Sequence, residues 1–206
     1  MGHAKKPKKK YETPMHPWNK ARIEEERSIA RTYGTVNKTE LYKMATILKR
    51  IKDQVKKLTP LTGSQAEKET AQLKQKLVSL GLLQQEQEVD DALGIALKDV
   101  MERRLQTLVF RKGLARSMKQ ARQFITHGHI LINGNKTTSP SYLVRTDEEH
   151  SLQFMTTSPF TREDHPERSN KSELVQKNTL EAQEQVAKKK EESMPKKRPG
   201  KRRRRT

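Results

Sequence analysis

The residues of this sequence best suited to chemistry are the lysines and arginines between residues 103 and 146, a stretch that contains no aspartate or glutamate. In a chain of which 33% is charged, so long a stretch without an acidic residue is not expected from composition alone. Ammonium and guanidinium groups only donate hydrogen bonds, and they pair well with anions such as phosphate. The stretch therefore predicts a phosphate-binding surface, carried by Arg103, Arg104, Arg111, Lys112, Arg116, Lys119, Arg122, Lys136 and Arg145.

Two predicted helices would place most of these cations on outward faces. The first is expected from Asp99 to about Lys112 and the second from Ser117 to about His127. Successive residues of a helix are about 100° apart, so the apolar residues of each would share an inward face. The outward faces would carry Arg103, Arg104, Thr107 and Arg111 on the first helix and Arg116, Lys119, Arg122, Gln123 and Thr126 on the second. This interpretation requires that carboxylates elsewhere in the chain do not pair with the arginines.

Signals at the helix ends support these boundaries. Asp99-Val-Met-Glu102 and Ser117-Met-Lys-Gln120 both have the form of a capping box, and Gly113 and Gly128 would end the two helices. A helix N-terminus presents free N–H groups and the positive end of a dipole, which suits phosphate. Ser117 and Gln120 therefore join the candidate binding residues.

After residue 128 the hydrophobic pattern changes from a helical to an alternating period. Ile130, Leu131 and Ile132 lead into Asn133-Gly134, which is the strongest short signal for a two-residue hairpin turn. Further strand signals lie at Tyr142, Val144, Leu152 and Phe154. A small sheet is therefore expected after the two helices, with Asn133 and Lys136 at its hairpin as candidate binding residues.

The pair His127-Gly-His129 resembles a metal-binding motif. A protein zinc site needs three or four ligands, and this chain has no cysteine and no acidic residue between Arg103 and Arg145. We therefore predict no metal and no cofactor. The two imidazoles are expected to contact phosphates or 2′-hydroxyl groups, or to cap the hairpin. Phe110, on the basic side of its helix, could stack on an unpaired base, but packing is favoured.

The sequence before residue 99 predicts helices, and these helices carry no recognisable catalytic or binding motif. Helical spacing of apolar residues extends over 37–58 and 64–80, which would form an antiparallel pair, and a short charged helix is expected over 21–31. Residues 86–91 form an acidic, Gln-rich loop. Trp18 lies in a proline-bearing segment, where it could stack on a base or anchor the segment, and packing is the commoner role.

Composition limits the class of protein. The 206 residues include 44 Lys and Arg against 25 Asp and Glu, a net charge of +19 that attracts a polyanion. Only 31% of the chain is hydrophobic, so its cores must be modest. The absence of cysteine excludes disulfides and cysteine catalysis. No apolar run approaches the roughly 18 residues of a membrane span, and the first residues lack a signal peptide's apolar stretch. An intracellular protein without a membrane partner is expected.

These features divide the chain into four expected parts. Residues 1–20 form a basic extended arm and 161–206 a disordered, low-complexity basic tail, with a weak helix over 172–190. The basic runs in both are expected to lie on nucleic-acid phosphates. Between them lie an N-terminal helical region, 21–98, and an RNA-binding module of two helices and a small β-sheet, 99–160. The predicted fold class is α+β.

The sequence resembles a known family. Its motifs are Arg103-Arg104-Leu105, Gly113-Leu-Ala-Arg-Ser117, Ala121-Arg122, Gly128, Ile130, Ile132-Asn133-Gly134 and Ser139-Pro140. They resemble the RNA-binding module named after ribosomal protein S-four. The N-terminal Tyr11-Glu-Thr-Pro14, His16-Pro-Trp-Asn-Lys20 and Tyr33-Gly34 are similar to the archaeal and eukaryotic-cytosolic branch of that ribosomal protein. The resemblance covers about 11–160.

The resemblance implies a function. Members of the family are structural proteins of the small ribosomal subunit that bind ribosomal RNA directly, nucleate assembly of the subunit body and contribute to translational accuracy. They lie beside ribosomal protein S-five, so the expected partners are small-subunit ribosomal RNA and neighbouring ribosomal proteins, with no small-molecule substrate. A location on the cytoplasmic ribosome follows. The N-terminal metal-binding cysteines of bacterial members are absent here, which agrees with the prediction of no metal.

Three alternatives remain. A ribosome-assembly factor could carry the same module and bind only transiently. An RNA-modifying enzyme would need a further catalytic domain, which the short flanking regions do not supply. A non-specific DNA-packaging protein is suggested by the basic tails alone. The expected RNA-binding residues are Arg103, Arg104, Arg111, Lys112, Arg116, Ser117, Lys119, Gln120, Arg122, Gln123, His127, His129, Asn133 and Lys136.

Overall fold

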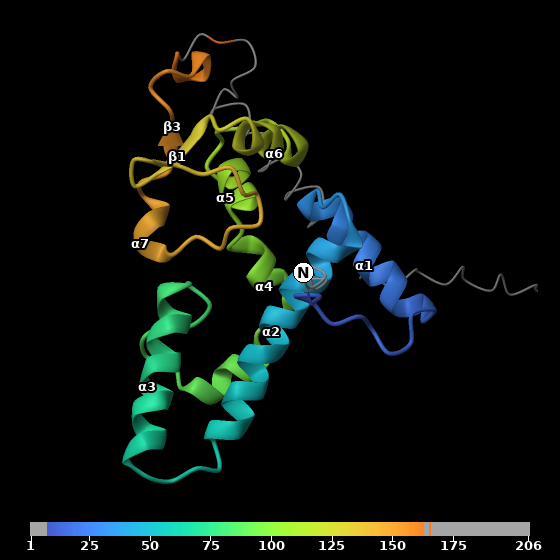
Figure 1. The fold of residues 1–206 in the computed structure, drawn as a ribbon, viewed down its shortest axis with the longest axis vertical. Coiled ribbons are helices and arrows are strands. Elements are labelled where there is room, and N and C mark those ends of the chain that lie inside the picture. The colour runs from blue at the N-terminus through green and yellow to red at the C-terminus, as the bar shows by residue number, and fades with distance from the viewer. Residues whose placement is uncertain (1–7, 163–164, 166–206) are drawn as a thin grey trace, which may run out of the picture. The chain divides into compact units, whose positions relative to one another are not determined.

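The computed structural model describes residues 8–162 and 165, and this part of the chain contains seven α-helices, two short 3-10 helices and a three-stranded sheet (Figure 1). The expected helix over 172–190 and the basic runs at Lys5–Lys6 and Lys196–Arg205 lie outside these residues. Within the described part of the chain, no helix is long and apolar enough to cross a membrane.

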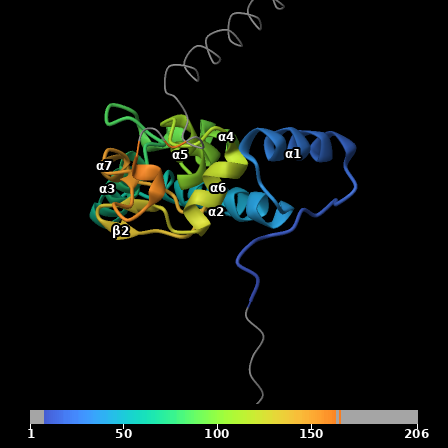
Figure 2. The same ribbon diagram turned by 90° about the horizontal axis from the view of Figure 1, so that it is seen from above.

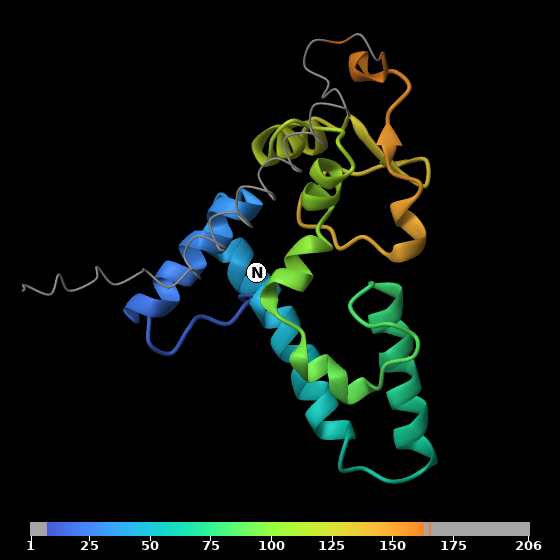
Figure 3. The same cartoon turned by 180° about the vertical axis from the view of Figure 1, so that it is seen from behind.

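Three helices precede the sheet-bearing part of the fold, as the sequence predicts. Helix α1, Lys20–Tyr33, begins where the Asn19 side chain accepts a hydrogen bond from the Arg22 N–H, and it ends at Gly34, whose φ of +58° is left-handed. Helices α2, Lys38–Leu58, and α3, Ser64–Ser79, lie side by side and antiparallel, as Figures 1 and 3 show. Each predicted range is confirmed to within a few residues.

A 3-10 helix, η1 (Val89–Gly94), follows the acidic, Gln-rich segment and packs against α2. The prediction of a loop over 86–91 is therefore wrong for its last residues. Helix α4, Leu97–Glu102, comes next. Together with α1, α2 and α3 these elements enclose a first hydrophobic core of Tyr33, Leu41, Met44, Leu48, Ile51, Val55, Leu73, Leu77, Leu83, Ala92, Ile95, Val100 and Met101.

The helix expected from Asp99 to Lys112 is broken in the middle. Helix α4 ends at Glu102, and α5 spans Leu105–Arg111. The break is held by a distant segment, because the Leu105 N–H donates to the Tyr142 carbonyl (2.8 Å) and the Val144 N–H donates to the Arg103 carbonyl (3.0 Å). No glycine or proline marks the position, so the break has no local signal in the sequence.

The predicted capping role of Asp99 is also wrong. Asp99 is the third residue of α4, and its carboxylate reaches back to accept from the Ala96 N–H at 2.8 Å. The second capping prediction is confirmed in its main feature, because Ser117 Oγ accepts from the Gln120 N–H at 3.2 Å and begins α6, Met118–Thr126. The Gln120 side chain accepts from the N–H of Arg116, one residue before the cap, at 2.7 Å.

The predicted hairpin is present. Strand β1, Ile130–Ile132, pairs antiparallel with β2, Asn135–Lys136, and the turn residues Asn133 and Gly134 have φ of 49° and 78°. Two positive φ angles define the turn type that the right-handed twist of a hairpin favours. Strand β3, Gln153–Phe154, pairs with the other side of β1 and gives the order β2-β1-β3.

Two short elements were not predicted: α7, Thr146–Glu149, and the 3-10 helix η2, Pro159–Thr161. Tyr142 and Val144, which were expected in strands, flank a single β-bridge between Leu143 and Arg104. The second hydrophobic core comprises Leu105, Leu108, Val109, Ala115, Ala121, Phe124, Ile125, Ile130, Ile132, Val144, Leu152 and Phe154, with Phe110 packed against it. The α+β class is confirmed, and the two cores meet between Met101 and Leu105.

Candidate nucleic-acid interface

A stripe of exposed polar and cationic residues runs along α6. Arg116, Lys119, Gln123 and His127 are all exposed, and their spacing of three to four residues places them on one side of the helix. Lys136 of β2 extends this stripe, because a Cβ placed on Gly128, directly after His127, would lie 2.7 Å from the Lys136 ammonium nitrogen. We call these five residues the α6 face.

Two lysines of the α6 face have no carboxylate partner in the described part of the chain. Within the described residues, neither Lys119 nor Lys136 forms an ion pair with a carboxylate. Ser117, which begins α6, and Asn133, in the turn between β1 and β2, are also exposed. Exposed cations beside a capped helix N-terminus can bind phosphate oxygens through charge-assisted hydrogen bonds.

Arg104 and Arg122 do not belong to an outward basic face. The two arginines converge on Glu40 in the first turn of α2, where Arg104 Nη2 donates to Oε2 and Arg122 Nη2 donates to Oε1, both at 2.7 Å. The side chain of Arg104 is 1% exposed. The prediction that both arginines point outward, unmatched by carboxylates, is therefore wrong.

The physical reason is the position of Glu40 in the first turn of α2, where it meets both arginines. The side chains of Arg104, Arg122 and Glu40 are only 1%, 26% and 16% exposed, so the guanidinium groups have lost much of their water and pair with a carboxylate inside the protein. Burial acts to raise the pKa of Glu40, but hydrogen bonds and charge from Arg122 and Arg104 together outweigh it, so the pKa lies below its ordinary value. Glu40 therefore stays ionised and joins α2 to the two helices that carry the predicted site.

Arg103 and Arg111 are also paired with carboxylates, again contrary to the prediction. Arg103 Nη1 lies 2.9 Å from Glu149 of α7, and Arg111 Nη2 lies 2.9 Å from Glu102 at the end of α4. Arg111 keeps 55% of its side chain exposed, so it alone of these two is accessible to a ligand. Lys112 is half-buried and donates its ammonium to the Glu149 carbonyl.

A further set of contacts fixes the start of α6, and the sequence did not indicate it. The buried Gln106 side chain donates to the carbonyls of Gly34 (3.3 Å) and Met118 (2.9 Å), and so links the corner between α1 and α2 to the first residue of α6. A Cβ at Gly34 would lie 2.7 Å from the Met118 Cβ, so this close approach requires glycine. Neither Glu40 nor Gln106 carries a local sequence signal for these roles.

The two histidines have different surroundings. Their rings are parallel with centroids 6.3 Å apart, but His127 is exposed, whereas His129 Nδ1 lies 3.0 Å from Ser158 Oγ. The pKa of His129 is lowered, first by burial and then by the positive charges of His127 and Lys136. His129 is half-buried and contacts Ser158 beside the hairpin, and His127 is the imidazole available to a ligand. Among the described residues no three His, Asp or Glu side chains converge to hold a metal.

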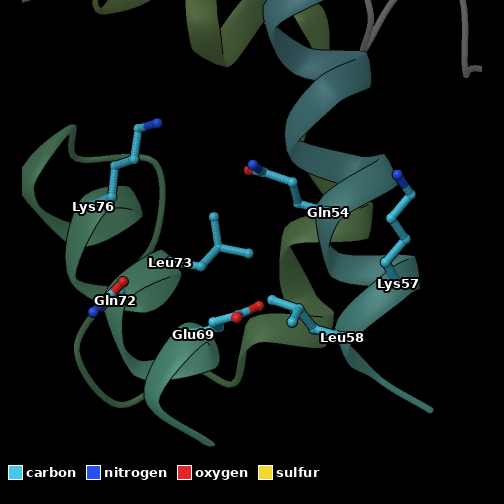
Figure 4. A pocket seen from close by; sticks show the side chains of 7 residues that line it. All are labelled: Gln54, Lys57, Leu58, Glu69, Gln72, Leu73 and Lys76. Carbon is cyan, nitrogen blue, oxygen red and sulfur yellow. The ribbon is translucent and has the colours of Figure 1, made fainter. Parts of the chain in front are cut away.

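A separate pocket of about 310 Å³ lies between α2 and α3 (Figure 4). It is lined by Lys57 and Leu58 of α2 and by Glu69, Leu73 and Lys76 of α3, and the Glu69 side chain points toward Leu58. Such a mixture lacks the placed donor and acceptor groups of a small-molecule site. We assign no function to it.

Comparison with known proteins agrees with this fold. Residues 103–150, which contain α5, α6, the hairpin and α7, match the family model described as the S4 domain. The chain is therefore an S4-domain protein.

Relatives over most of the chain are proteins named small ribosomal subunit protein uS4. The one from Methanococcus aeolicus is 48% identical over 171 residues, which cover 82% of this chain and 97% of that protein. Those from Methanococcus maripaludis strain C7 and Methanococcus vannielii are 47% and 48% identical over 170 residues, 82% of this chain and 96% of each protein. This chain belongs to the uS4 family, which confirms the resemblance found in its motifs.

Proposed function

We propose that this chain is a structural constituent of the small ribosomal subunit and binds its ribosomal RNA. The observation that carries the proposal is family membership over nearly the whole length of the uS4 relatives. The S4 domain and the α6 face support it independently, because a helix N-terminus flanked by exposed cations is suited to RNA phosphates. The role is structural rather than catalytic.

The α6 face would read the shape of the RNA rather than its sequence. An RNA helix hides its major-groove edges and displays phosphates and 2′-hydroxyls, which Arg116, Lys119 and Lys136 can reach as donors. Gln123, His127 and Asn133 offer further hydrogen-bonding groups suited to 2′-hydroxyls. Arg122 would contribute indirectly by joining α6 to Glu40, which Arg104 also binds, and Arg103 by joining the α4–α5 break to Glu149 of α7.

The finer parts of the role are also proposals. We infer that the protein binds early, helps to nucleate assembly of the subunit body, contributes to translational accuracy and lies beside ribosomal protein S-five. The resemblance to the family supports these points. A ribosome-assembly factor with the same domain is the alternative, and stoichiometric presence in salt-washed mature subunits would separate a resident protein from a transient one.

The proposed function is tested by comparing the affinity of the protein for two polyanions at the same salt concentration. The purified protein is expected to bind naked small-subunit ribosomal RNA at least about tenfold more tightly than duplex DNA, because shape and 2′-hydroxyl contacts add to the phosphate contacts that both offer. Filter binding or fluorescence anisotropy at several salt concentrations measures this ratio. Equal affinity for both would support a non-specific DNA-packaging protein instead.

A further inference from the structure

Trp18, the chain's only tryptophan, is 90% exposed. The sequence favoured packing against the fold, and the structure contradicts that expectation. A tryptophan left in water forgoes the large stabilisation that its burial would give, so an exposed one calls for a binding explanation.

The segment that carries Trp18 is fixed from its C-terminal side. Arg22 Nη2 donates to the carbonyls of His16 (3.1 Å) and Pro17 (2.8 Å), and Arg22 Nη1 donates to Glu26 of the same helix at 2.8 Å. Asn19 caps α1 directly after Trp18. These contacts hold the backbone around the indole in one conformation.

The segment is also fixed from its N-terminal side. The Glu12 N–H donates to Thr46 Oγ1 of α2 at 2.9 Å, the Glu12 carboxylate pairs with Lys49 at 2.5 Å, and the Tyr11 and Tyr42 rings stack at 6.3 Å. Figure 2 shows this segment, which passes α2 and then curves outward to the start of α1. An aromatic side chain presented on a fixed loop loses less conformational entropy on binding than one on a flexible loop.

The charges around the indole favour a polyanion. Lys8, Lys9, Lys10 and Lys20 are all exposed, and Lys20 lies 4.0 Å from Glu24 in a pair whose two side chains remain open to solvent. The one carboxylate between residues 8 and 20, that of Glu12, is already paired with Lys49. Cations on either side of an exposed aromatic ring are the arrangement by which proteins hold unpaired nucleotides, with phosphates on the cations and a base on the ring.

We propose that Trp18 is a stacking site for an unpaired base of the small-subunit ribosomal RNA. The inference rests on the proposed function and deepens it, because it adds a contact point on the N-terminal segment, separate from the α6 face. The indole would stack on the face of the base, with Lys20 and His16 placed to contact the neighbouring phosphates. Stacking is tolerant of base identity, so this contact would recognise an unstacked nucleotide rather than a sequence.

The test uses the fluorescence of this single tryptophan in the full-length protein. On titration with naked small-subunit ribosomal RNA, the emission is expected to be quenched, and the quenching should reach a plateau when each protein has bound one site on the RNA. In the complex the indole should also become protected from quenching by acrylamide. Trp18→Ala is expected to weaken binding between about fivefold and about a hundredfold, the range for one base stacked on an aromatic ring. Met15→Ala, at an equally exposed position in the same loop, is the control and should bind normally.

The outcomes separate this inference from the proposed function. If the RNA binds tightly while the indole stays open to acrylamide and Trp18→Ala binds normally, the stacking site is wrong and the function stands. Protection only in the intact subunit would mean that a protein covers Trp18, which also overturns the inference. Failure of the wild-type protein to bind the RNA would overturn both. Because Trp18 lies outside both cores, its replacement should leave the thermal midpoint unchanged.

Discussion

Replacement of Glu40 by alanine is expected to lower the free energy of unfolding by about 3 kcal/mol, because it leaves a buried arginine without its counter-charge. Arg104 is 1% exposed and directs Nη2 to Glu40, and Arg122 donates to the same carboxylate with both terminal nitrogens. Urea denaturation of the two proteins measures the difference. The matched control is Glu12→Ala, which removes an exposed carboxylate paired with Lys49 and should change stability little.

A second substitution at this position, Glu40→Gln, separates the positioning of α6 from simple electrostatics in RNA binding. If Glu40 acted only as a negative charge near the cations, Glu40→Gln would tighten binding. If it positions α6 through Arg122, the substitution should weaken binding, even at a temperature where the variant remains folded. A variant as stable as the wild type, with unchanged or higher RNA affinity, would show that the Glu40 pairs have no such role.

The lowered pKa of Glu40 gives the stability difference a pH dependence. A carboxyl group whose pKa is lower in the folded state stabilises the fold above its unfolded pKa and loses that contribution as pH falls through the folded value. The difference in unfolding free energy between wild type and Glu40→Ala should therefore be full near neutral pH and narrow as the solution is acidified below pH 4.5, the ordinary pKa of a glutamate.

The double variant Lys119→Glu and Lys136→Glu is expected to lose at least about tenfold in affinity for small-subunit ribosomal RNA. Each lysine that contacts a phosphate releases about one counterion, so the slope of log affinity against log salt should become shallower by about 2. Both side chains are exposed and unpaired with carboxylates among the described residues, so stability should change little.

The control for this variant is Lys68→Glu with Lys76→Glu on α3. It makes the same change of net charge at two exposed positions distant in sequence from the α6 face. Equal losses in the two double variants would mean that net charge, rather than the α6 face, governs binding. A triple change of Arg104, Arg116 and Arg122 would be uninformative, because two of these arginines hold the fold together through Glu40.

Local signals in the sequence predicted most of the secondary structure. The spacing of Leu41, Leu48 and Val55 marks α2, Ser117 marks the start of α6, and Asn133-Gly134 marks the hairpin turn. Each depends on residues within a few positions of one another, which is why a single sequence reveals them. The break between α4 and α5 depends on hydrogen bonds to residues 140–144 and could not be predicted in this way.

The same limit applies to the binding surface. Helical periodicity separates an apolar face from a polar one, but it does not show whether the polar face meets water or another helix. The Arg104 side chain lies against Glu40, 64 positions earlier, and Arg122 meets the same residue across 82 positions. The sequence therefore predicted a cationic region correctly and assigned to RNA several arginines that bind carboxylates of the protein itself.

The central claim is that the α6 face, and not every exposed cation, meets the ribosomal RNA. Chemical acetylation of lysines, compared by mass spectrometry in the free protein and in its complex with naked small-subunit ribosomal RNA, tests it in the unaltered chain. We expect Lys119 and Lys136 to be protected in the complex while Lys68 and Lys76 on α3 keep their reactivity. Full reactivity of Lys119 and Lys136 in a saturated complex would contradict the account.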